Sequence, residues 1–483
     1  MSETTGRVLD RRRAGVLLHA TSLPDATAGA LGQAARSFID WLAAGGFSVW
    51  QLLPLGPVGA DRSPYYGRSN HAGDPGLVDL GELGEAGGAA SARATRQERL
   101  SEAGRRLLVS GGAQAADFSA FRAREAYWLG DYALFTAIQA RESGRPWWEW
   151  PEDLRRRDGA ALERARAELA TERADVEAGQ YFFHAQYGAL KRYAAGKGIR
   201  LFGDIPIYLA PDSVEVWAHP ELFQLGTDGR PTAVAGVPPD YFSADGQLWG
   251  NPLYRWDEHE RTGFRWWIER LRAQFDLFDL VRIDHFRGLE SYWAVPAGAR
   301  TAATGEWRPA AGAKLLARAR DVFGRLDVVA EDLGVITPEV EKLRDGFGLP
   351  GMRVAQFGFD GNSANLHLPH NWSTRSIAYT GTHDNDTTAG WFATLEPGLR
   401  AEVVDYLGAS ADDVVPAMTR SLLASVAGLA VVPMQDLLGL GREARMNTPG
   451  TVTGNWSWVL AWSQVPAGLA TRCRRWNELY GRA

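Results

Sequence analysis

The sequence has almost no cysteine, no long basic run and no long apolar run, and each of these shortages excludes a class of protein. Cys473 is the single cysteine in 483 residues, so an internal disulfide is excluded and a reducing compartment fits. The net charge of -6, with only short Lys/Arg clusters, argues against a nucleic-acid surface. No apolar run is long enough to span a bilayer, and the polar first ten residues lack the apolar segment of a secretory signal. We therefore expect a cytoplasmic protein that binds neither nucleic acid nor membrane.

Eight short apolar segments alternate with stretches of helical periodicity. They span residues 15–19, 47–54, 199–207, 280–283, 326–330, 352–357, 376–380 and 429–434. Strands that alternate with helices favour a parallel sheet, and eight of them is the number in a (β/α)8 TIM barrel. We expect residues 1–483 to form one catalytic α/β barrel.

Two segments are too long to be simple connections between strands. Residues 82–175 are rich in Ala, Arg and Glu, and they predict a helical insertion subdomain. Residues 210–262 are rich in Pro, Gly and aromatic side chains, and they predict a loop-rich insertion. Long loops in compact domains usually serve as lids or binding loops, so we expect this insertion over the active-site cleft.

Several of the predicted strands end in polar side chains. These are Asp204, Arg282 with Asp284, Glu331 with Asp332, His383 with Asp384, and Gln435 with Asp436. All strands of a barrel are parallel, so these ends meet at one face, where barrel enzymes keep their chemistry. Asp332 and Asp436 have a simpler interpretation as N-caps of the helices that follow them.

Carboxylates grouped at one face fit either glycoside chemistry or a metal site. The histidines are scattered and form no ligand pair at helical spacing, and Arg282 between acids disfavours a divalent cation. The 19 tryptophans favour a sugar site, because flat rings pack against the apolar faces of pyranoses. We therefore expect no metal.

The sequence resembles the 4-α-glucanotransferases, also called amylomaltases or disproportionating enzymes, of glycoside hydrolase family 77. The motifs that carry this resemblance run in the family's order over nearly the whole chain. They are residues 63–65 (SPY), 203–207 (GDIPI), 238–242 (PPDYF), 281–286 (VRIDHF), 330–334 (AEDLG), 381–386 (GTHDND), 434–436 (MQD) and 445–447 (RMN). The resemblance implies an α-amylase-type barrel with helical and loop subdomains and no separate C-terminal β domain.

The resemblance also implies roles for individual residues. It makes Asp284 the nucleophile, Glu331 the general acid/base and Asp384 the stabiliser of the transition state, with no cofactor. The residues it implies in glucose binding are Tyr65, Asp204, Tyr241, Gln247, Trp249, Arg282, His383 and Asn385. Residues 66–74 and 365–370 depart from the family pattern, which bears on donor preference but touches no catalytic carboxylate.

The expected activity is retaining transfer of α-1,4-glucan segments, with maltooligosaccharides as substrates and a sugar 4-hydroxyl as acceptor. A hydrolase of the same fold is the nearest alternative, because it differs only in using water for the second step. A carbohydrate-binding protein without catalysis would not need three carboxylates. A metal hydrolase is a third alternative, which a chelator would inactivate.

Overall fold

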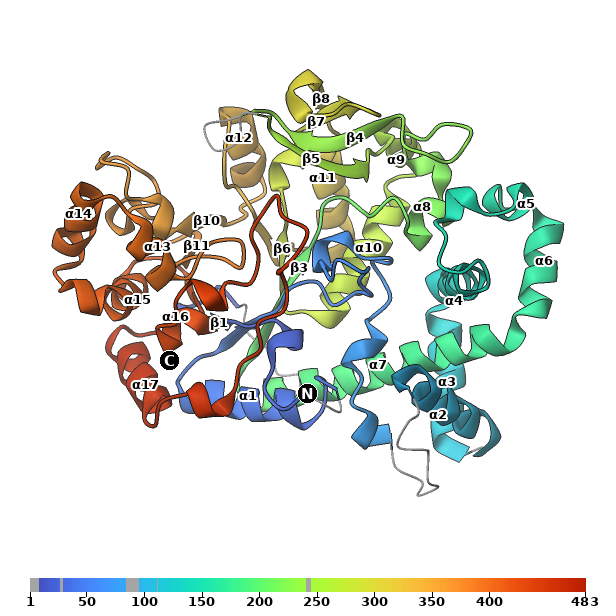
Figure 1. The fold of residues 1–483 in the computed structure, drawn as a ribbon, viewed down its shortest axis with the longest axis horizontal. Coiled ribbons are helices and arrows are strands. Elements are labelled where there is room, and N and C mark those ends of the chain that lie inside the picture. The colour runs from blue at the N-terminus through green and yellow to red at the C-terminus, as the bar shows by residue number, and fades with distance from the viewer. Residues whose placement is uncertain (1–7, 27–28, 84–94, 111, 240–244) are drawn as a thin grey trace.

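The core of the computed structural model is an eight-stranded parallel sheet that curls into a nearly closed barrel (Figure 1). The structure describes the whole chain except residues 1–7, 27–28, 84–94, 111 and 240–244. The strands, in their spatial order, are β10 (Gly351–Val354), β11 (Ser376–Tyr379), β12 (Leu429–Pro433), β1 (Arg13–Leu17), β2 (Val49–Gln51), β3 (Arg200–Ile205), β6 (Leu280–Ile283) and β9 (Val328–Ala330). All eight strands predicted from the sequence are present, which confirms the (β/α)8 barrel.

Side chains alternate between the barrel interior and the layer of helices outside. Leu280 and Val329 belong to the hydrophobic cluster inside the barrel. Their neighbours in sequence, Val281 and Val328, belong to the cluster between the strands and the helices outside. Strands buried on both faces are continuous apolar runs rather than alternating ones. This explains why the barrel strands could be predicted from the sequence.

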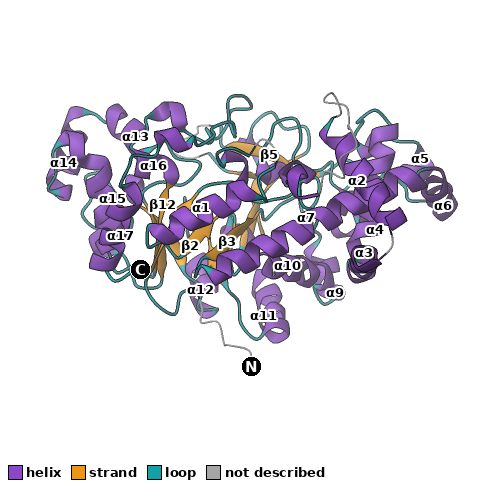
Figure 2. Cartoon of the chain, turned by 90° about the horizontal axis from the view of Figure 1, so that it is seen from below, coloured by secondary structure: helices purple, strands orange, loops and turns teal. Residues whose placement is uncertain are grey.

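Helices surround these strands, as the view in Figure 2 shows. Those that follow or precede the barrel strands are α1 (Gln33–Ala44), α7 (Ala170–Gly196), α10 (Arg265–Leu277), α11 (Gly312–Phe323), α12 (Pro338–Gly346), α15 (Val414–Ala424), α16 (Met434–Leu438) and α17 (Leu469–Leu479). From Met434 to Ala483 the chain forms helices and loops without a strand. Within the described part of the chain, no helix has the length and apolarity to cross a bilayer.

Two groups of helices lie at opposite ends of the molecule in both views (Figures 1 and 2). One group consists of α2 (Arg96–Ser110), α3 (Gly112–Arg124), α4 (Ala126–Arg141), α5 (Glu152–Arg155) and α6 (Gly159–Glu168). The other contains α13 (Thr388–Thr394) and α14 (Pro397–Leu407) beside α15. The predicted end of the helical insertion at residue 175 falls inside α7, which runs unbroken towards β3. The division of the chain into subdomains stays a prediction.

A second, antiparallel sheet lies beside the barrel, at the top of Figure 1. Its strands, in order, are β5 (Gln247–Pro252), β4 (Ala233–Val237), β7 (Ser291–Pro296) and β8 (Glu306–Pro309). The insertion at 210–262 therefore supplies two strands as well as α8 (Val214–Ala218) and α9 (Trp256–Arg261), which its composition did not reveal. Gly and Pro within β4 and β5 weaken the strand signal, because neither residue favours a strand interior.

Candidate active site

The predicted catalytic residues and the predicted glucose-binding residue Asp204 lie at the carboxyl ends of four barrel strands. Asp204 is the penultimate residue of β3, and Asp284 and Glu331 directly follow β6 and β9. Residues 383–385 lie in the turn after β11. Because these four strands are parallel members of one barrel, their polar ends face the same side of the molecule.

Arg282 holds two of these carboxylates with one guanidinium group. Its Nη1 donates to Asp204 Oδ2 at 2.6 Å, and its Nη2 lies 2.8 Å from Asp284 Oδ1. Asp204 and Arg282 are direct partners in the β3–β6 register, so strand pairing itself brings them together. The Tyr65 hydroxyl donates to the same Asp204 oxygen at 2.7 Å. The Asp284 side chain remains 29% exposed, whereas Asp204 and Arg282 are buried.

Burial and ion pairing act in opposite directions on this cluster. Burial raises the pKa of Asp284, and Arg282 opposes that effect. Burial likewise raises the pKa of Asp204 to about 7, again against the pull of Arg282. Burial alone would lower the pKa of Arg282, but the two aspartates outweigh it and raise that pKa instead. The guanidinium therefore keeps its charge and favours the ionised form of both carboxylates.

Glu331 lies beside the loop that carries Asp284, and its Oε1 accepts from Leu333 N at 3.0 Å. Its backbone N–H donates to Ile283 O at 3.1 Å, and its carbonyl accepts from Phe286 N at 3.1 Å, which ties it to both sides of Asp284. Burial raises the pKa of Glu331 to about 8, with Arg282 opposing and Asp284 adding to the rise. The Glu331 side chain is thus protonated at neutral pH, as a general acid requires.

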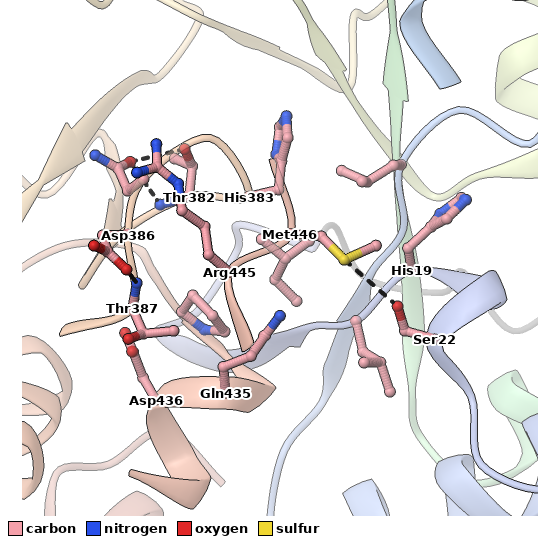
Figure 3. A pocket seen from close by; sticks show the side chains of 15 residues that line it. His19, Ser22, Thr382, His383, Asp386, Thr387, Gln435, Asp436, Arg445 and Met446 are labelled. Carbon is pink, nitrogen blue, oxygen red and sulfur yellow. Dashed lines mark hydrogen bonds between the residues drawn. The ribbon is translucent and has the colours of Figure 1, made fainter. Parts of the chain in front are cut away.

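The turn after β11 is fixed by the loop after β12, and Figure 3 shows Arg445 and His383 from these two loops beside one pocket. Asn447 Nδ2 donates to Asp384 Oδ1 at 2.6 Å, and Arg445 Nη2 donates to the Asp384 carbonyl at 2.6 Å. His383 Nε2 lies 3.4 Å from Asp384 Oδ2. Burial lowers the pKa of His383, so this ring is neutral at neutral pH.

Aromatic stacking joins this turn to the Arg282 cluster. The His383 ring stacks on Tyr65 with centroids 5.2 Å apart, and Trp456 packs within 6.0 Å of both rings. Asn385 Oδ1 accepts from the Thr382 backbone and hydroxyl, each at 2.9 Å, so this oxygen shapes the turn. Tyr65 and His383 are therefore placed together as predicted, and the predicted residue Asn385 lines the pocket of Figure 3.

The second sheet contributes Gln247 and Trp249 from β5. Trp249 Nε1 donates to Gln247 Oε1 at 3.1 Å, and its ring meets His285 edge to face at 4.8 Å. His285 follows Asp284 and has a left-handed backbone with φ 47°, a strained conformation that is frequent at functional sites. The two β5 residues thus reach the loop after β6, whereas the predicted Tyr241 lies outside the described residues.

Four residues at the site were given no role by sequence reasoning: His285, Arg445, Asn447 and Trp456. His285 adjoins Asp284, and Arg445 and Asn447 belong to the motif at 445–447, so their positions were a usable signal. Nothing in the sequence around Trp456 distinguishes it from the other 18 tryptophans, because its contacts come from packing alone.

Asp332 and Asp436 are structural, but neither caps the helix that follows it, so that interpretation is wrong in its details. Asp332 accepts from Met352 N at 2.6 Å and pairs with Arg344 at 2.5 Å, which fixes the start of β10. Asp436 accepts from Thr388 N at 2.7 Å, at the first turn of α13 rather than of its own helix. Both side chains serve to join neighbouring barrel segments.

The two stretches that depart from the family pattern support the walls of the site. His367 Nδ1 accepts from Val354 N at 3.1 Å, and burial lowers the pKa of His367 to about 4, so it is a neutral acceptor at the end of β10. In the other stretch, buried Glu215 accepts from Ser69 Oγ at 2.8 Å and from Asn70 N at 2.7 Å. Among the described residues, no group of three or more His, Cys, Asp or Glu side chains is arranged to hold a metal ion.

The sequence matches, over residues 18–463, the model of the glycoside hydrolase family 77, described as 4-alpha-glucanotransferase. It is 49% identical to the 4-alpha-glucanotransferase of Thermus thermophilus, over 97% of this chain and 98% of that protein. It is 44% identical to that of Synechocystis sp., over 98% and 99% of the two chains. The amylomaltase of Streptococcus agalactiae, solved in complex with acarbose, superposes with a TM-score of 0.93 at 36% identity, over 98% of this chain and 100% of that one. The chain therefore belongs to glycoside hydrolase family 77, the 4-alpha-glucanotransferases.

Proposed function

We propose that Asp284, Glu331 and Asp384 carry out the 4-alpha-glucanotransferase reaction of this chain, in which a segment of α-1,4-glucan moves to the 4-hydroxyl of glucose or of another glucan. The observation that supports these roles best is the contrast between two neighbouring carboxyl groups. Burial raises the pKa of both groups, but Asp284 faces a guanidinium at 2.8 Å that opposes this rise, whereas the pKa of Glu331 reaches about 8. One ionised and one protonated carboxyl group are what a retaining glycosidase needs.

In the first step, Asp284 attacks the anomeric carbon and Glu331 gives its proton to the departing glycosidic oxygen. The glycosidic bond breaks, the leaving sugar carries the proton away, and a covalent glycosyl–Asp284 ester remains. Arg282 keeps Asp284 ionised before the attack, and the charge of Asp384 faces the developing oxocarbenium ion. Because no group is oxidised or reduced, the reaction needs no cofactor.

In the second step, Glu331, now ionised, removes a proton from the 4-hydroxyl of the acceptor as that oxygen attacks the ester. The new glycosidic bond forms, Asp284 leaves as a carboxylate, and Glu331 regains its proton. We assign Gln247 and Trp249 to binding of the acceptor, and the contact of Trp249 with His285, next to Asp284, supports this assignment. A held acceptor reacts at an effective concentration far above that of free sugar.

Further polar side chains are free to hold the glucose unit that reacts. Asp204 Oδ1 and His383 Nε2 are buried and have no hydrogen-bond partner among the described residues. Buried polar atoms usually have partners, so these two atoms are suited to sugar hydroxyls. Maltooligosaccharides are the substrates that we infer, and the single buried cysteine, Cys473, supports a cytoplasmic location.

Incubation with maltotriose alone distinguishes transfer from hydrolysis. We expect glucose and a ladder of longer maltooligosaccharides, with little increase in total reducing ends. The protein with Asp284→Asn serves as the inactive control. An increase of one reducing end for each bond cleaved would show a hydrolase and contradict the transferase assignment.

The roles of Asp284 and Glu331 have a separate test. Glu331→Gln removes the proton donor, so it should block reaction with ordinary maltooligosaccharides but still allow attack on a donor with a good leaving group. Intact mass of this variant after mixing with such a donor should show one added glycosyl unit. Peptide mapping should place it on Asp284, and any other position would contradict the assignment.

A further inference from the structure

The turn that carries Asp384 is held by a closed set of hydrogen bonds from one short segment, residues 445–447. Asn447 donates from its side chain to Asp384 Oδ1 at 2.6 Å and from its backbone to His383 O at 3.1 Å. Arg445 donates to the Asp384 carbonyl at 2.6 Å and to the Asn447 carbonyl at 2.7 Å. The segment follows β12, so it fixes the turn after β11 from the neighbouring strand.

The cation in this segment is directed away from the carboxylate it adjoins. Arg445 uses Nη2 and Nε on two backbone carbonyls, whereas the Asp384 carboxylate receives the neutral amide of Asn447. Among the described residues, no Lys or Arg lies within 4 Å of the Asp384 carboxylate, and His383 is neutral. Asp384 is thus oriented by a short hydrogen bond without a counterion.

We propose that Asn447 is a positioning residue that fixes the Asp384 carboxylate while leaving its negative charge uncompensated. This inference rests on the proposed role of Asp384 in stabilising the transition state. An oxocarbenium-like transition state gains most from a fixed negative charge that no other cation already satisfies. Asn447 holds Asp384 through Oδ1 only, and the Asp384 side chain remains 43% exposed.

The test compares Asn447→Ala and Asn447→Asp with wild type, by kcat and KM on maltotriose across pH. Asn447→Ala loses a hydrogen bond to a charged group, which should lower kcat by about 10- to 100-fold with a smaller change in KM. Asn455→Ala is the matched control, because Asn455 lies in the same part of the chain but bonds only to Thr448 and Thr451. Its kcat should equal that of wild type.

Asn447→Asp should change the pH dependence of kcat/KM, which would stay the same if Asn447 had only a structural role. This isosteric change sets two carboxyl oxygens face to face, so the pair must share a proton until the pH is raised. The acidic limb of the kcat/KM profile should therefore move up by about one pH unit or more. The other titratable or charged groups near Asp384 are Tyr65, Asp284, His383 and Arg445, and all are unchanged in this variant.

Asp384→Asn, measured in parallel, separates failure of this inference from failure of the proposed function. If Asp384→Asn is inactive while both Asn447 variants match wild type in kcat and pH profile, the positioning role is wrong and the catalytic role stands. If Asp384→Asn is fully active, the proposed role of Asp384 is wrong. Loss of folded protein in both Asn447 variants, judged by thermal unfolding, would overturn the proposal by assigning Asn447 a purely structural role.

Discussion

The loop after β6 and the turn after β11 each carry an aspartate for which we propose a catalytic role, but the two aspartates have different surroundings. Asp284 shares the Arg282 guanidinium with Asp204, and most of that cluster is buried. Asp384 is more exposed and accepts from the neutral amide of Asn447. The nearest guanidinium to that turn, Arg445, is used on carbonyl groups.

This difference fits the roles proposed for the two carboxylates, nucleophile for Asp284 and transition-state stabiliser for Asp384. A nucleophile must be ionised before it attacks, and a buried carboxylate stays ionised only with a cation beside it. A group that stabilises positive charge in the transition state acts better without a cation of its own. Asp284 therefore has a counterion, whereas Asp384 has an uncharged hydrogen-bond donor.

Among the substitutions that test this comparison, replacing Arg282 should have the largest effect on stability and activity. Arg282→Met leaves two carboxylates without their counterion in a buried site, so it should destabilise the protein by about 3–5 kcal/mol. Activity should fall by more than about 1000-fold, because the nucleophile loses both its charge state and its orientation. Urea unfolding and maltotriose turnover measure the two effects.

Arg445→Met is the matched control for that prediction. It removes hydrogen bonds to two backbone carbonyls but no carboxylate pairing, so the stability loss should be about 1–3 kcal/mol. Equal destabilisation by the two substitutions would contradict the distinction between a charge-paired and a neutral arrangement.

Because Glu331 is protonated in the folded protein, we expect the free energy of unfolding to depend on pH. This effect should be smaller than that of replacing Arg282. The pKa of Glu331 is about 8 in the folded protein against 4.5 for an unperturbed glutamate, so between these values the folded state keeps a proton that the unfolded chain loses. Its contribution is therefore complete below about pH 4.5 and is lost as pH rises through about 8.

Glu331→Gln has no proton to lose, so its melting temperature should exceed that of wild type increasingly from pH 5 to pH 8. The expected gain at pH 8 is on the order of 2–5 °C, with no difference near pH 4.5 as the internal control. Thermal unfolding in a pH series measures it. A difference that is constant across this range would show that Glu331 is ionised in the folded protein.

The barrel and the Arg282 cluster were predictable from the sequence for a physical reason. Strands buried on both faces are continuous apolar runs, and parallel strands place their polar ends together without further information. Arg282 and Asp284 stand two residues apart, and the β3–β6 register then brings Asp204 alongside. Local pattern and strand pairing thus determine this half of the site.

The turn after β11 was less accessible, because its partners come from loops. Asn447 and Trp456 lie more than 60 residues from Asp384 in the sequence, and no periodicity sets how such loops fold back. The strands β4 and β5 were missed for a related reason. Gly and Pro within them weaken the strand signal, and the pairing of β4 with β7 joins segments more than 50 residues apart in the chain. The caps proposed for Asp332 and Asp436 failed because their donors belong to other segments.

Tyr65 contacts both regions, through its hydroxyl and through its ring. Removing the hydroxyl alone should have the smallest effect of the predicted substitutions. The hydroxyl donates to Asp204 at 2.7 Å, while the ring stacks on His383 at 5.2 Å. Tyr65→Phe removes one hydrogen bond from an aspartate that keeps Arg282, so it should lower kcat/KM by about 5- to 10-fold, which corresponds to about 1 kcal/mol. Tyr65→Ala also removes the ring that packs on His383, so it should cost more.

Double-mutant cycles with Asn447→Ala then show which part of Tyr65 belongs to which region. The hydroxyl serves the Arg282 cluster, so Tyr65→Phe and Asn447→Ala should be additive in the free energy of kcat/KM to within about 0.5 kcal/mol. The ring packs on His383, whose carbonyl accepts from the Asn447 backbone, so Tyr65→Ala and Asn447→Ala should deviate from additivity by more than that. Strong coupling already in the Tyr65→Phe cycle would mean that the two aspartates are held by one continuous network, and the distinction between the two strand ends would then have to be abandoned.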